Sequence, residues 1–152
     1  MKIFNIKDKL EYIEEVAILT QNEWGKIKEG QAGFKEKVEY KIDKIKNSLN
    51  LNNYCKLILL DGEKLVGFIS IFPTDGSEFN NLTPWYATMY VKKEYRGFGY
   101  SKVLNNAILK EAKNRGFDKI YLKSELNNYY EKFGAIYIAD LKNGEKLYYI
   151  KL

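Results

Sequence analysis

The chain has 152 residues, of which 45% are apolar and 30% are charged, a composition typical of one soluble globular domain rather than of a disordered segment. It contains no histidine and a single cysteine, which excludes a Ser-His-Asp triad, a HExxH zinc site, an internal disulfide and a CxxC motif. The net charge of +5 comes from intermixed basic and acidic residues, and it favours an anionic ligand without requiring nucleic acid.

The amino-terminal third predicts one strand followed by two helices. Residues 2–6 form the predicted strand, and Asp8 with Glu11 three residues later is typical of a helix start. Residues at helical spacing continue that helix to Gly25: Leu10, Ile13, Ala17, Thr20 and Trp24. A second helical stripe runs from Phe34 to Leu49. We interpret its lysines as a solvated face, because acidic residues are interspersed among them: Glu36, Glu39 and Asp43.

The middle of the chain predicts a β-hairpin and then a β-α-β unit. Residues 57–60 and 64–72 flank the turn Asp61-Gly62, which is typical of a hairpin. A polar loop at 73–83 leads to a strand at 85–91, whose side chains alternate in character. The strongest helical pattern of the chain follows, from about Gly99 to Arg115. It connects to a short strand, 119–123, which should therefore lie parallel to the strand before the helix.

The last part of the chain predicts a short helix at 125–133 and two strands, 135–141 and 146–152, joined by the hairpin turn Asn143-Gly144. No repeat or linker interrupts the sequence, so we expect one domain over residues 1–152. The predicted order is β-α-α-β-β-β-α-β-α-β-β. It gives a mixed α/β fold with a mostly antiparallel sheet, one parallel β-α-β unit and helices on both faces.

Charges near the amino terminus and short apolar stretches predict a cytoplasmic protein with no membrane attachment. The first residues lack the apolar region of a signal peptide and carry several charges: Lys2, Lys7, Asp8, Lys9 and Glu11. The stretch Leu65–Phe72 is far shorter than a membrane span. Cys55 opens an apolar run, which predicts a buried structural thiol rather than a nucleophile.

A glycine-rich segment between the 85–91 strand and the following helix carries the most chemical information. It reads Arg96-Gly97-Phe98-Gly99-Tyr100-Ser101. Two glycines allow the backbone to turn its N–H groups inward, and the start of the next helix adds unpaired N–H groups and a positive dipole end. Such a loop can hold a pyrophosphate, or it can be an ordinary glycine-rich turn. A Rossmann pattern is excluded by Lys102 in place of the third glycine, and no Gly-Lys-Ser/Thr ending indicates a Walker loop.

Two segments together resemble one enzyme family. The run VKKEYRGFGYSKVL, Val91–Leu104, resembles the acetyl-CoA pyrophosphate motif of the GNAT superfamily of N-acetyltransferases, Arg/Gln-x-x-Gly-x-Gly/Ala. Arg96 and Gly99 match it, while Ser101 stands where glycine or alanine is usual. Downstream, NYYEKFGA (128–135) resembles the family's Phe-Tyr-Glu-Lys-x-Gly-Phe block. The predicted order of elements agrees with the family over essentially the whole chain, so the resemblance implies a GNAT-type fold.

The resemblance also implies acetyl-CoA as the co-substrate, no metal, and roles for individual residues. The strand whose main chain pairs with the pantetheine arm corresponds to Met89, Tyr90 and Val91. The pyrophosphate loop, acting mainly through backbone N–H groups, corresponds to Arg96, Gly97, Phe98, Gly99, Tyr100 and Ser101. Tyr130 matches the tyrosine that faces the departing CoA sulfur. A phenol has a pKa of ~10 and a thiol ~8.5, so we expect Tyr130 to stabilise the thiolate by a hydrogen bond. We predict that neighbouring Tyr129 packs in the core.

An amine acceptor must lose a proton before it attacks, and this chain has no histidine to accept it. A carboxylate, a tyrosine, a water chain or the free base of the substrate must serve instead. The candidates lie on segments that we expect to border the acceptor cleft: Glu23, Asp75, Glu78, Tyr86 and Asp140. The chain offers no activated cysteine or serine, so we expect direct acyl transfer without a covalent enzyme intermediate.

We favour an N-acetyltransferase that acts on a primary amine of a small molecule, and a peptide or protein amine remains open. The alternative is a non-catalytic acyl-CoA-binding sensor: Tyr130 favours the enzyme, and the lack of an obvious base favours the sensor. A nucleic-acid partner rests only on the net charge, so we expect none. We expect the acceptor determinants in the loops 25–33, 73–84 and 140–146. The oligomeric state stays open between a monomer and a homodimer.

Overall fold

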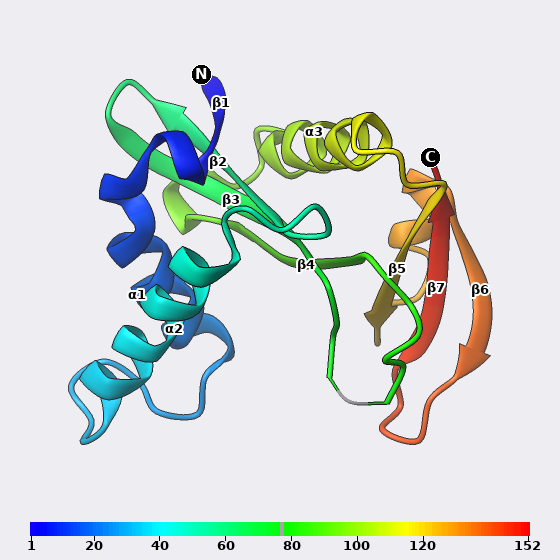
Figure 1. The fold of residues 1–152 in the computed structure, drawn as a ribbon, viewed down its shortest axis with the longest axis horizontal. Coiled ribbons are helices and arrows are strands. Elements are labelled where there is room, and N and C mark those ends of the chain that lie inside the picture. Colours follow the sequence, from blue (N-terminus) through cyan, green and yellow to red (C-terminus); the bar gives the residue numbers. More distant parts are fainter. Residues whose placement is uncertain (77) are drawn as a thin grey trace.

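The computed structural model describes residues 1–76 and 78–152, which form one seven-stranded sheet with helices on both faces (Figure 1). The strands lie in the order β1-β2-β3-β4-β5-β7-β6. Their bounds are β1 Lys2–Asn5, β2 Cys55–Asp61, β3 Lys64–Phe72, β4 Trp85–Val91, β5 Lys119–Ser124, β6 Ala135–Asp140 and β7 Lys146–Lys151. Neighbouring strands are antiparallel except β4 and β5, which are parallel. The predicted mixed fold with a parallel β-α-β unit is confirmed.

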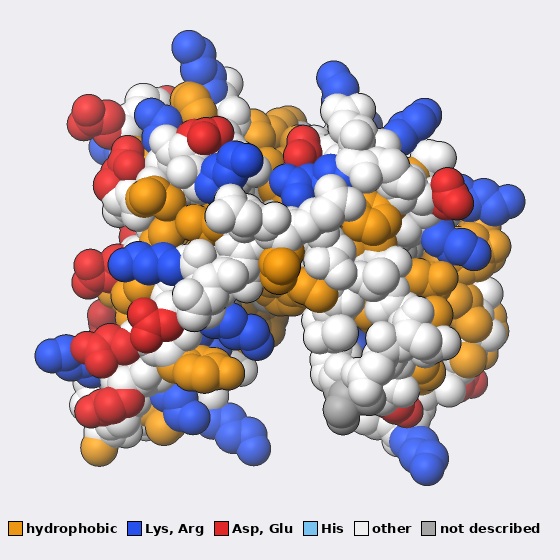
Figure 2. Space-filling model, viewed as in Figure 1, with side chains coloured by type: hydrophobic (Ala, Val, Ile, Leu, Met, Phe, Trp, Pro, Cys, Tyr) orange, Lys and Arg blue, Asp and Glu red, His pale blue; other side chains and the backbone are white. Residues whose placement is uncertain are grey.

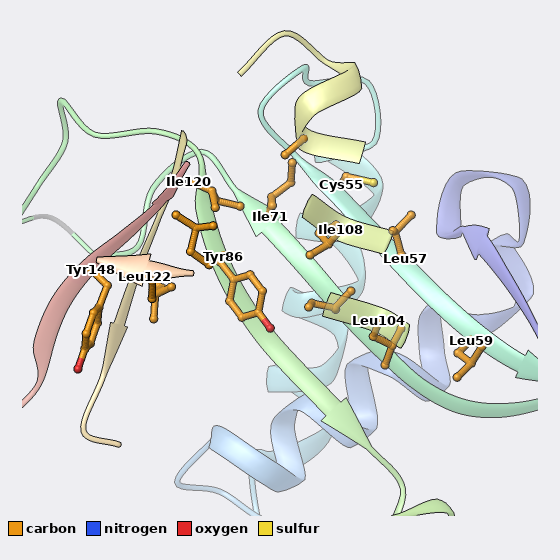
Figure 3. Close-up of a cluster of buried hydrophobic side chains, with 14 of the residues drawn as sticks. Cys55, Leu57, Leu59, Ile71, Tyr86, Leu104, Ile108, Ile120, Leu122 and Tyr148 are labelled. Carbon is orange, nitrogen blue, oxygen red and sulfur yellow. The ribbon is translucent and has the colours of Figure 1, made fainter. Parts of the chain in front are cut away.

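Helices α1 (Ile13–Trp24) and α2 (Phe34–Ser48) cover one face of the sheet, and α3 (Tyr100–Asn114) covers the other. Strand β2 contributes side chains to the buried clusters on both faces of the sheet, because successive side chains of a strand point to opposite faces. Leu57 and Leu59 pack with α3, as Figure 3 shows, whereas Ile58 packs with α1 and α2. Burial on both faces explains the continuous apolar run of this strand. In the described part of the chain, no helix is long and apolar enough to cross a membrane.

Two helix predictions are wrong, and the local backbone structure explains both. The first helix begins at Ile13, because the preceding residues form short 3-10 turns; the Asn5 side chain, not Asp8, caps the first turn. The predicted helix at 125–133 is reduced to a 3-10 turn at Tyr130–Phe133. Asn128 there has a φ of +60°, a left-handed conformation that asparagine tolerates but that a continuous helix does not allow.

The predicted apolar stripes are correct in the middle of each helix and wrong at some edges. Ile13 and Ala17 of α1 are buried as expected. Leu10, Trp24 and Val103 are instead 54%, 49% and 45% exposed. Leu10 lies outside the helix altogether, and Trp24, at the last position of α1, packs edge-on against Tyr90 of β4 with ring centroids 6.3 Å apart. The exposed members of the predicted stripes therefore lie outside a helix or in its first or last turn, whereas residues in the middle are buried.

Strands β4 and β5 meet at one end and then diverge (Figure 1). Their register pair is Trp85 opposite Tyr121, and the Tyr121 N–H donates to the Pro84 carbonyl at 3.0 Å. Over the rest of its length, β4 pairs only with β3 within the residues that the structure describes. The β5-side edge of β4 therefore has backbone groups without a strand partner, and this open edge leads toward the start of α3.

Candidate functional site

The glycine-rich loop joins β4 to α3 through two residues in the left-handed backbone conformation. Gly97 has a φ of +85° and Gly99 a φ of +84°, which glycine adopts at little cost. Gly99 is the N-cap of α3 and has no side chain to accept a hydrogen bond. The N–H groups of the first turn of α3 therefore lack a capping side chain, and they carry the positive end of the helix dipole.

A cavity of about 330 Å³, here called the loop cavity, lies at this end of α3. It is lined by the end of β4, the loop and one residue of α1: Glu23, Met89, Tyr90, Val91, Tyr95, Arg96, Gly97, Gly99, Tyr100 and Ser101. Eight of the nine residues expected to contact the co-substrate are thus brought together. Phe98 is not among the lining residues; its side chain is 70% exposed and lies against Tyr100. Glu23 and Tyr95 line the cavity without having been predicted there.

Arg96 braces the loop against β4. Its Nε donates to the Val91 carbonyl at 2.8 Å, and its guanidinium carbon lies 5.6 Å from the centre of the Tyr90 ring. Both contacts fix the guanidinium at the wall of the loop cavity. A fixed cation and the N-terminal end of a helix together favour an anion in this cavity, where Glu23 is the one acidic residue in the lining.

Tyr130 lies outside the loop cavity and packs against Tyr86 of β4. The two rings meet edge-on with centroids 5.7 Å apart, and the Tyr86 hydroxyl donates weakly to the Met89 sulfur at 3.9 Å. Figure 3 shows Tyr86 between the β5 and α3 parts of the buried cluster. Burial, with a smaller contribution from Tyr129, raises the pKa of Tyr130, so its hydroxyl is protonated at neutral pH and can donate a hydrogen bond.

The prediction that Tyr129 is the core residue of this pair is wrong. Tyr130 packs against the main buried cluster, whereas Tyr129 contacts the neighbouring rings of Tyr130 and Phe133. The prediction assumed the 100° step of an α-helix. The segment is not an α-helix: Asn128, just before the two tyrosines, has a φ of +60°, and Tyr130–Phe133 form a 3-10 turn, so the α-helical step does not apply to this pair.

The candidate proton acceptors are scattered. Glu23 lines the loop cavity. Burial raises the pKa of Tyr86, so this tyrosine stays protonated and does not fit the role of a base. The other three candidates lie in the loop after β3 and at the end of β6, and none is in the lining of the cavities described here: Asp75, Glu78 and Asp140. The carboxylate of Asp75 lies 4.0 Å from the Lys123 ammonium.

A second cavity, of about 340 Å³, lies on the α1–α2 face of the sheet. Its walls combine apolar and aromatic side chains, hydroxyls and three lysines, and we call it the lysine cavity. The lining residues come from α1, α2, the segment before β2 and strands β2 to β4: Ala17, Thr20, Trp24, Lys41, Lys44, Ile45, Ser48, Tyr54, Lys56, Phe72, Pro73, Thr74 and Thr88. Sequence reasoning missed this cavity, because its residues are distant in the chain and form no motif.

Lys56 is the unusual group of this cavity, because its side chain is only 3% exposed. Its Nζ donates to the Ser70 hydroxyl at 2.5 Å, and the Thr88 hydroxyl donates to the same oxygen at 2.8 Å. The ammonium also lies 5.2 Å and 5.3 Å from the ring centres of Phe68 and Phe72. Burial, with a smaller contribution from Lys41, lowers the pKa of Lys56 to about 7.

Thr88 lies in a β-bulge of β4, next to residues that line each of the two cavities. The register between β3 and β4 shifts between Phe68 and Ser70, and Thr88 has a φ of +48°, which is unusual for a β-branched residue. Thr88 lines the lysine cavity, and the next residue, Met89, lines the loop cavity. The strain at this position is a recognised feature of functional sites.

Comparisons with known proteins agree with this architecture. The Schizosaccharomyces pombe protein N-alpha-acetyltransferase 30 is 33% identical to the chain over 82 residues, 51% of this chain and 54% of that protein. The match therefore spans about half the length of this curated relative. Residues 19–135, well over half of the chain, match the family model described as the acetyltransferase (GNAT) family.

Solved structures of acetyltransferases share the fold. The aminoglycoside 6'-N-acetyltransferase from Enterococcus faecium superposes with a TM-score of 0.70 at 17% identity, over 99% of this chain and 97% of that one. The PaiA N-acetyltransferase from Thermoplasma acidophilum, in complex with coenzyme A, superposes with a TM-score of 0.66 at 21% identity, over 100% of both chains. These identities establish a common fold alone. With the family match over residues 19–135, the chain belongs to the acetyltransferase (GNAT) family.

Proposed function

We propose that this protein is an N-acetyltransferase that transfers the acetyl group of acetyl-CoA directly to a primary amine. The observation that carries the proposal is the arrangement along β4. The loop cavity contains the uncapped N-terminus of α3 and Arg96, and it lies at one end of the β4 edge that has no strand partner in the described residues. Tyr130 packs against Tyr86 of the same strand. An acyl-CoA molecule has a matching sequence of groups, with an anionic pyrophosphate, a chain of amides and a thioester. The coenzyme A complex of the Thermoplasma structure supports this co-substrate.

In this proposal each element has one task. The loop from Arg96 to Ser101 binds the pyrophosphate, and the backbone of Met89 to Val91 pairs with the pantetheine amides. Acetyl-CoA supplies a thioester that the free base of the amine attacks at carbon; the carbon–sulfur bond breaks, the sulfur departs as a thiolate, and the proton that the nitrogen loses on becoming an amide passes to solvent water. Tyr130 donates its hydroxyl hydrogen bond toward that sulfur as the negative charge develops. Because burial raises the pKa of Tyr130, full transfer of its proton is unfavourable, and stabilisation by the hydrogen bond is the expected role.

The environment of the one cysteine supports direct transfer. Cys55 is 2% exposed in the cluster on the α3 face, and burial raises the pKa of its thiol to about 11. A thiolate is the nucleophilic form of cysteine, so this thiol is poorly suited to carry an acetyl group. We propose that the amine of a small molecule attacks the acetyl group itself. A peptide amino terminus is the alternative that the name of the Schizosaccharomyces pombe relative suggests.

Acetyl-CoA and CoA are both expected to raise the melting temperature of the protein. Binding to the folded state at a ligand concentration of 100 Kd contributes about 2.7 kcal/mol, which corresponds to roughly 5–10 °C for a domain of this size. NAD and ATP should have a much smaller effect, since neither offers the pantetheine arm. Differential scanning fluorimetry with the four ligands measures this directly. Equal shifts with all four would remove the specific role of the loop cavity in binding CoA.

Tyr130→Phe tests whether the protein is an enzyme or an acyl-CoA sensor. The phenyl ring keeps the packing against Tyr86, and only the hydroxyl is lost. We expect kcat to fall by about 100-fold or less, at the lower end of the range for such donors, because a thiolate is already a good leaving group. The affinity for acetyl-CoA should change little, since the hydrogen bond strengthens only as charge develops.

The measurement is steady-state thiol release from acetyl-CoA with an amine identified in a broad screen. Tyr129→Phe is the matched control, because it removes the same hydroxyl from the adjacent residue. It should keep the wild-type kcat, because we assign Tyr129 no contact with the sulfur and its ring packs against Tyr130 and Phe133. A Tyr130→Phe variant with full kcat would show that the assigned role is wrong. If the wild type binds acetyl-CoA but acetylates no amine, the sensor function replaces the enzyme.

A further inference from the structure

The lysine cavity holds three basic side chains and no acidic side chain in its lining. Lys41 and Lys44 come from α2 and Lys56 from β2. None of the three takes part in an ion pair among residues 1–76 and 78–152. Burial, followed by repulsion from Lys44, lowers the pKa of Lys41. Like charges that share a site without a counter-ion are unfavourable, and an anion bound among them would relieve this repulsion.

Polar groups of this cavity have hydrogen-bonding capacity that the protein itself leaves unused. An ammonium has three donors, and in the described structure the Nζ of Lys56 has the Ser70 hydroxyl as its hydrogen-bond partner. Tyr54 is only 5% exposed, and its hydroxyl is buried without a hydrogen-bond partner among the described residues. Burial raises the pKa of Tyr54, so this hydroxyl is a donor. A carboxylate in the cavity would accept hydrogen bonds from the remaining donors of the Lys56 ammonium.

The remaining lining indicates the other part of the ligand. Aromatic and aliphatic side chains form much of the wall, including Trp24, Ile45 and Phe72. A volume of about 340 Å³ is the size of a site for a small molecule. Figure 2 shows the molecule hollowed between its α1–α2 side and its β5–β7 side, with basic side chains along the α1–α2 side of the hollow. An apolar body with an anionic group therefore fits this cavity better than a polycation does.

The lysine cavity borders β4 next to the residues that we propose to pair with the pantetheine arm. The hydrogen bonds from Lys56 to Ser70 and from Thr88 to Ser70 form a chain that ends at the β-bulge of β4. The residue after Thr88 is Met89, which lines the loop cavity. A ligand in the lysine cavity thus lies on the opposite side of the bulge from the loop that we propose to bind the pyrophosphate.

We infer that the lysine cavity binds the acceptor, and that this acceptor is an amine with a carboxylate on an apolar body, of the amino acid class, whose anion is held by Lys41, Lys44 and Lys56. The inference rests on the proposed N-acetyltransferase function and narrows its substrate class. It also separates this chain from the aminoglycoside acetyltransferase that shares its fold, because a polycationic acceptor would meet three lysines.

Binding of charged and neutral probes tests the anion site without turnover. The probes are N-acetyl-L-alanine, N-acetyl-L-leucine and N-acetyl-L-phenylalanine, each paired with its uncharged amide and titrated by NMR chemical shift. We expect at least one acid to bind about tenfold tighter than its amide, as for a charge-assisted hydrogen bond. Lys44→Glu should remove this preference. Lys46→Glu makes the same charge change on α2 at an exposed residue outside the lining, and should keep affinity within about twofold.

The binding result overturns the inference if every acid binds no better than its amide, if none of the acids binds, or if the two lysine variants lose the same affinity. The second measurement is kcat/KM for acetylation of three acceptors: L-phenylalanine, phenylethylamine and kanamycin. We expect the highest kcat/KM for L-phenylalanine, and a preference for phenylethylamine, which lacks the carboxylate, or for kanamycin counts against the inference. Selective binding of the acids without turnover of any amine would contradict the proposed enzyme but support the anion site.

Discussion

Replacing Gly99 by valine is expected to lower the affinity for CoA by about 100-fold or more while the protein remains folded. A Cβ at this position would meet no heavy atom of the protein within 4 Å, so the side chain does not clash in the free protein. The φ of +84° is nevertheless strongly unfavourable for a β-branched residue, at a cost of about 1–3 kcal/mol. Relief of this strain would turn the N–H groups of the loop away from the anion, and the added methyl groups would occupy the approach of the phosphates.

The size of the effect follows from the bonds that are lost. A hydrogen bond to a charged group contributes about 1.5–3 kcal/mol, so the loss of two N–H contacts lowers affinity by at least about 100-fold. Isothermal titration calorimetry with CoA measures this loss, and circular dichroism checks the fold.

Gly116→Val is the matched control for this variant. Gly116 lies just beyond the other end of α3, has a φ of +92°, and likewise has no heavy atom within 4 Å of an added Cβ. Valine there introduces comparable backbone strain far from the loop cavity, so we expect a similar loss of stability with wild-type affinity for CoA. Unchanged CoA affinity in a folded Gly99→Val variant would place the phosphate site elsewhere.

Replacing Lys56 by methionine is expected to stabilise the protein at neutral and acidic pH, and this gain should disappear as the pH approaches 10.5. Burial lowers the pKa of Lys56 from 10.5 in the unfolded chain to about 7 in the folded protein. Between these values the unfolded state binds more protons, so the stability of the wild type rises with pH, by up to about 1.4 kcal/mol per unit. Below pH 7 the full penalty of burying the ammonium is present. Methionine has a similar length and no charge, so its variant lacks this dependence.

Urea denaturation from pH 6 to pH 10 measures the difference in free energy of unfolding between the two proteins. Lys64→Met, at an exposed position of β3, is the control and should follow the wild-type curve. Parallel curves for Lys56→Met and the wild type would show that Lys56 keeps an ordinary pKa. We also expect Lys56→Met to lose affinity for the anionic probes, because stability and binding make opposite demands on this side chain.

The local pattern of the sequence was sufficient for most of the secondary structure. The hairpin at Asp61-Gly62 and the helix that begins after Gly99 were predicted from turn residues and periodicity, which are properties of neighbouring residues. The parallel pairing of β4 and β5 also followed, because a helical connection leaves few other topologies. Local reasoning failed at Asp8 and at 125–133, where asparagine side chains and backbone conformations compete with helix formation.

The sequence by itself determined the glycine-rich loop of this protein, since Arg96, Gly97 and Gly99 lie within four consecutive residues and the two glycines act through their own backbone. The tertiary structure decided which face each strand residue presents and what covers it. Lys56 stands in an apolar run, and only the packing of α1 and α2 over β2 makes it a buried amine. The lysine cavity likewise draws on residues from Ala17 to Thr88. Of the three loops in which we expect the acceptor determinants, it includes Pro73 and Thr74 of 73–84 and no residue of 25–33 or 140–146. Burial depends on contacts between segments distant in the chain, and periodicity within one segment carries no information about those contacts.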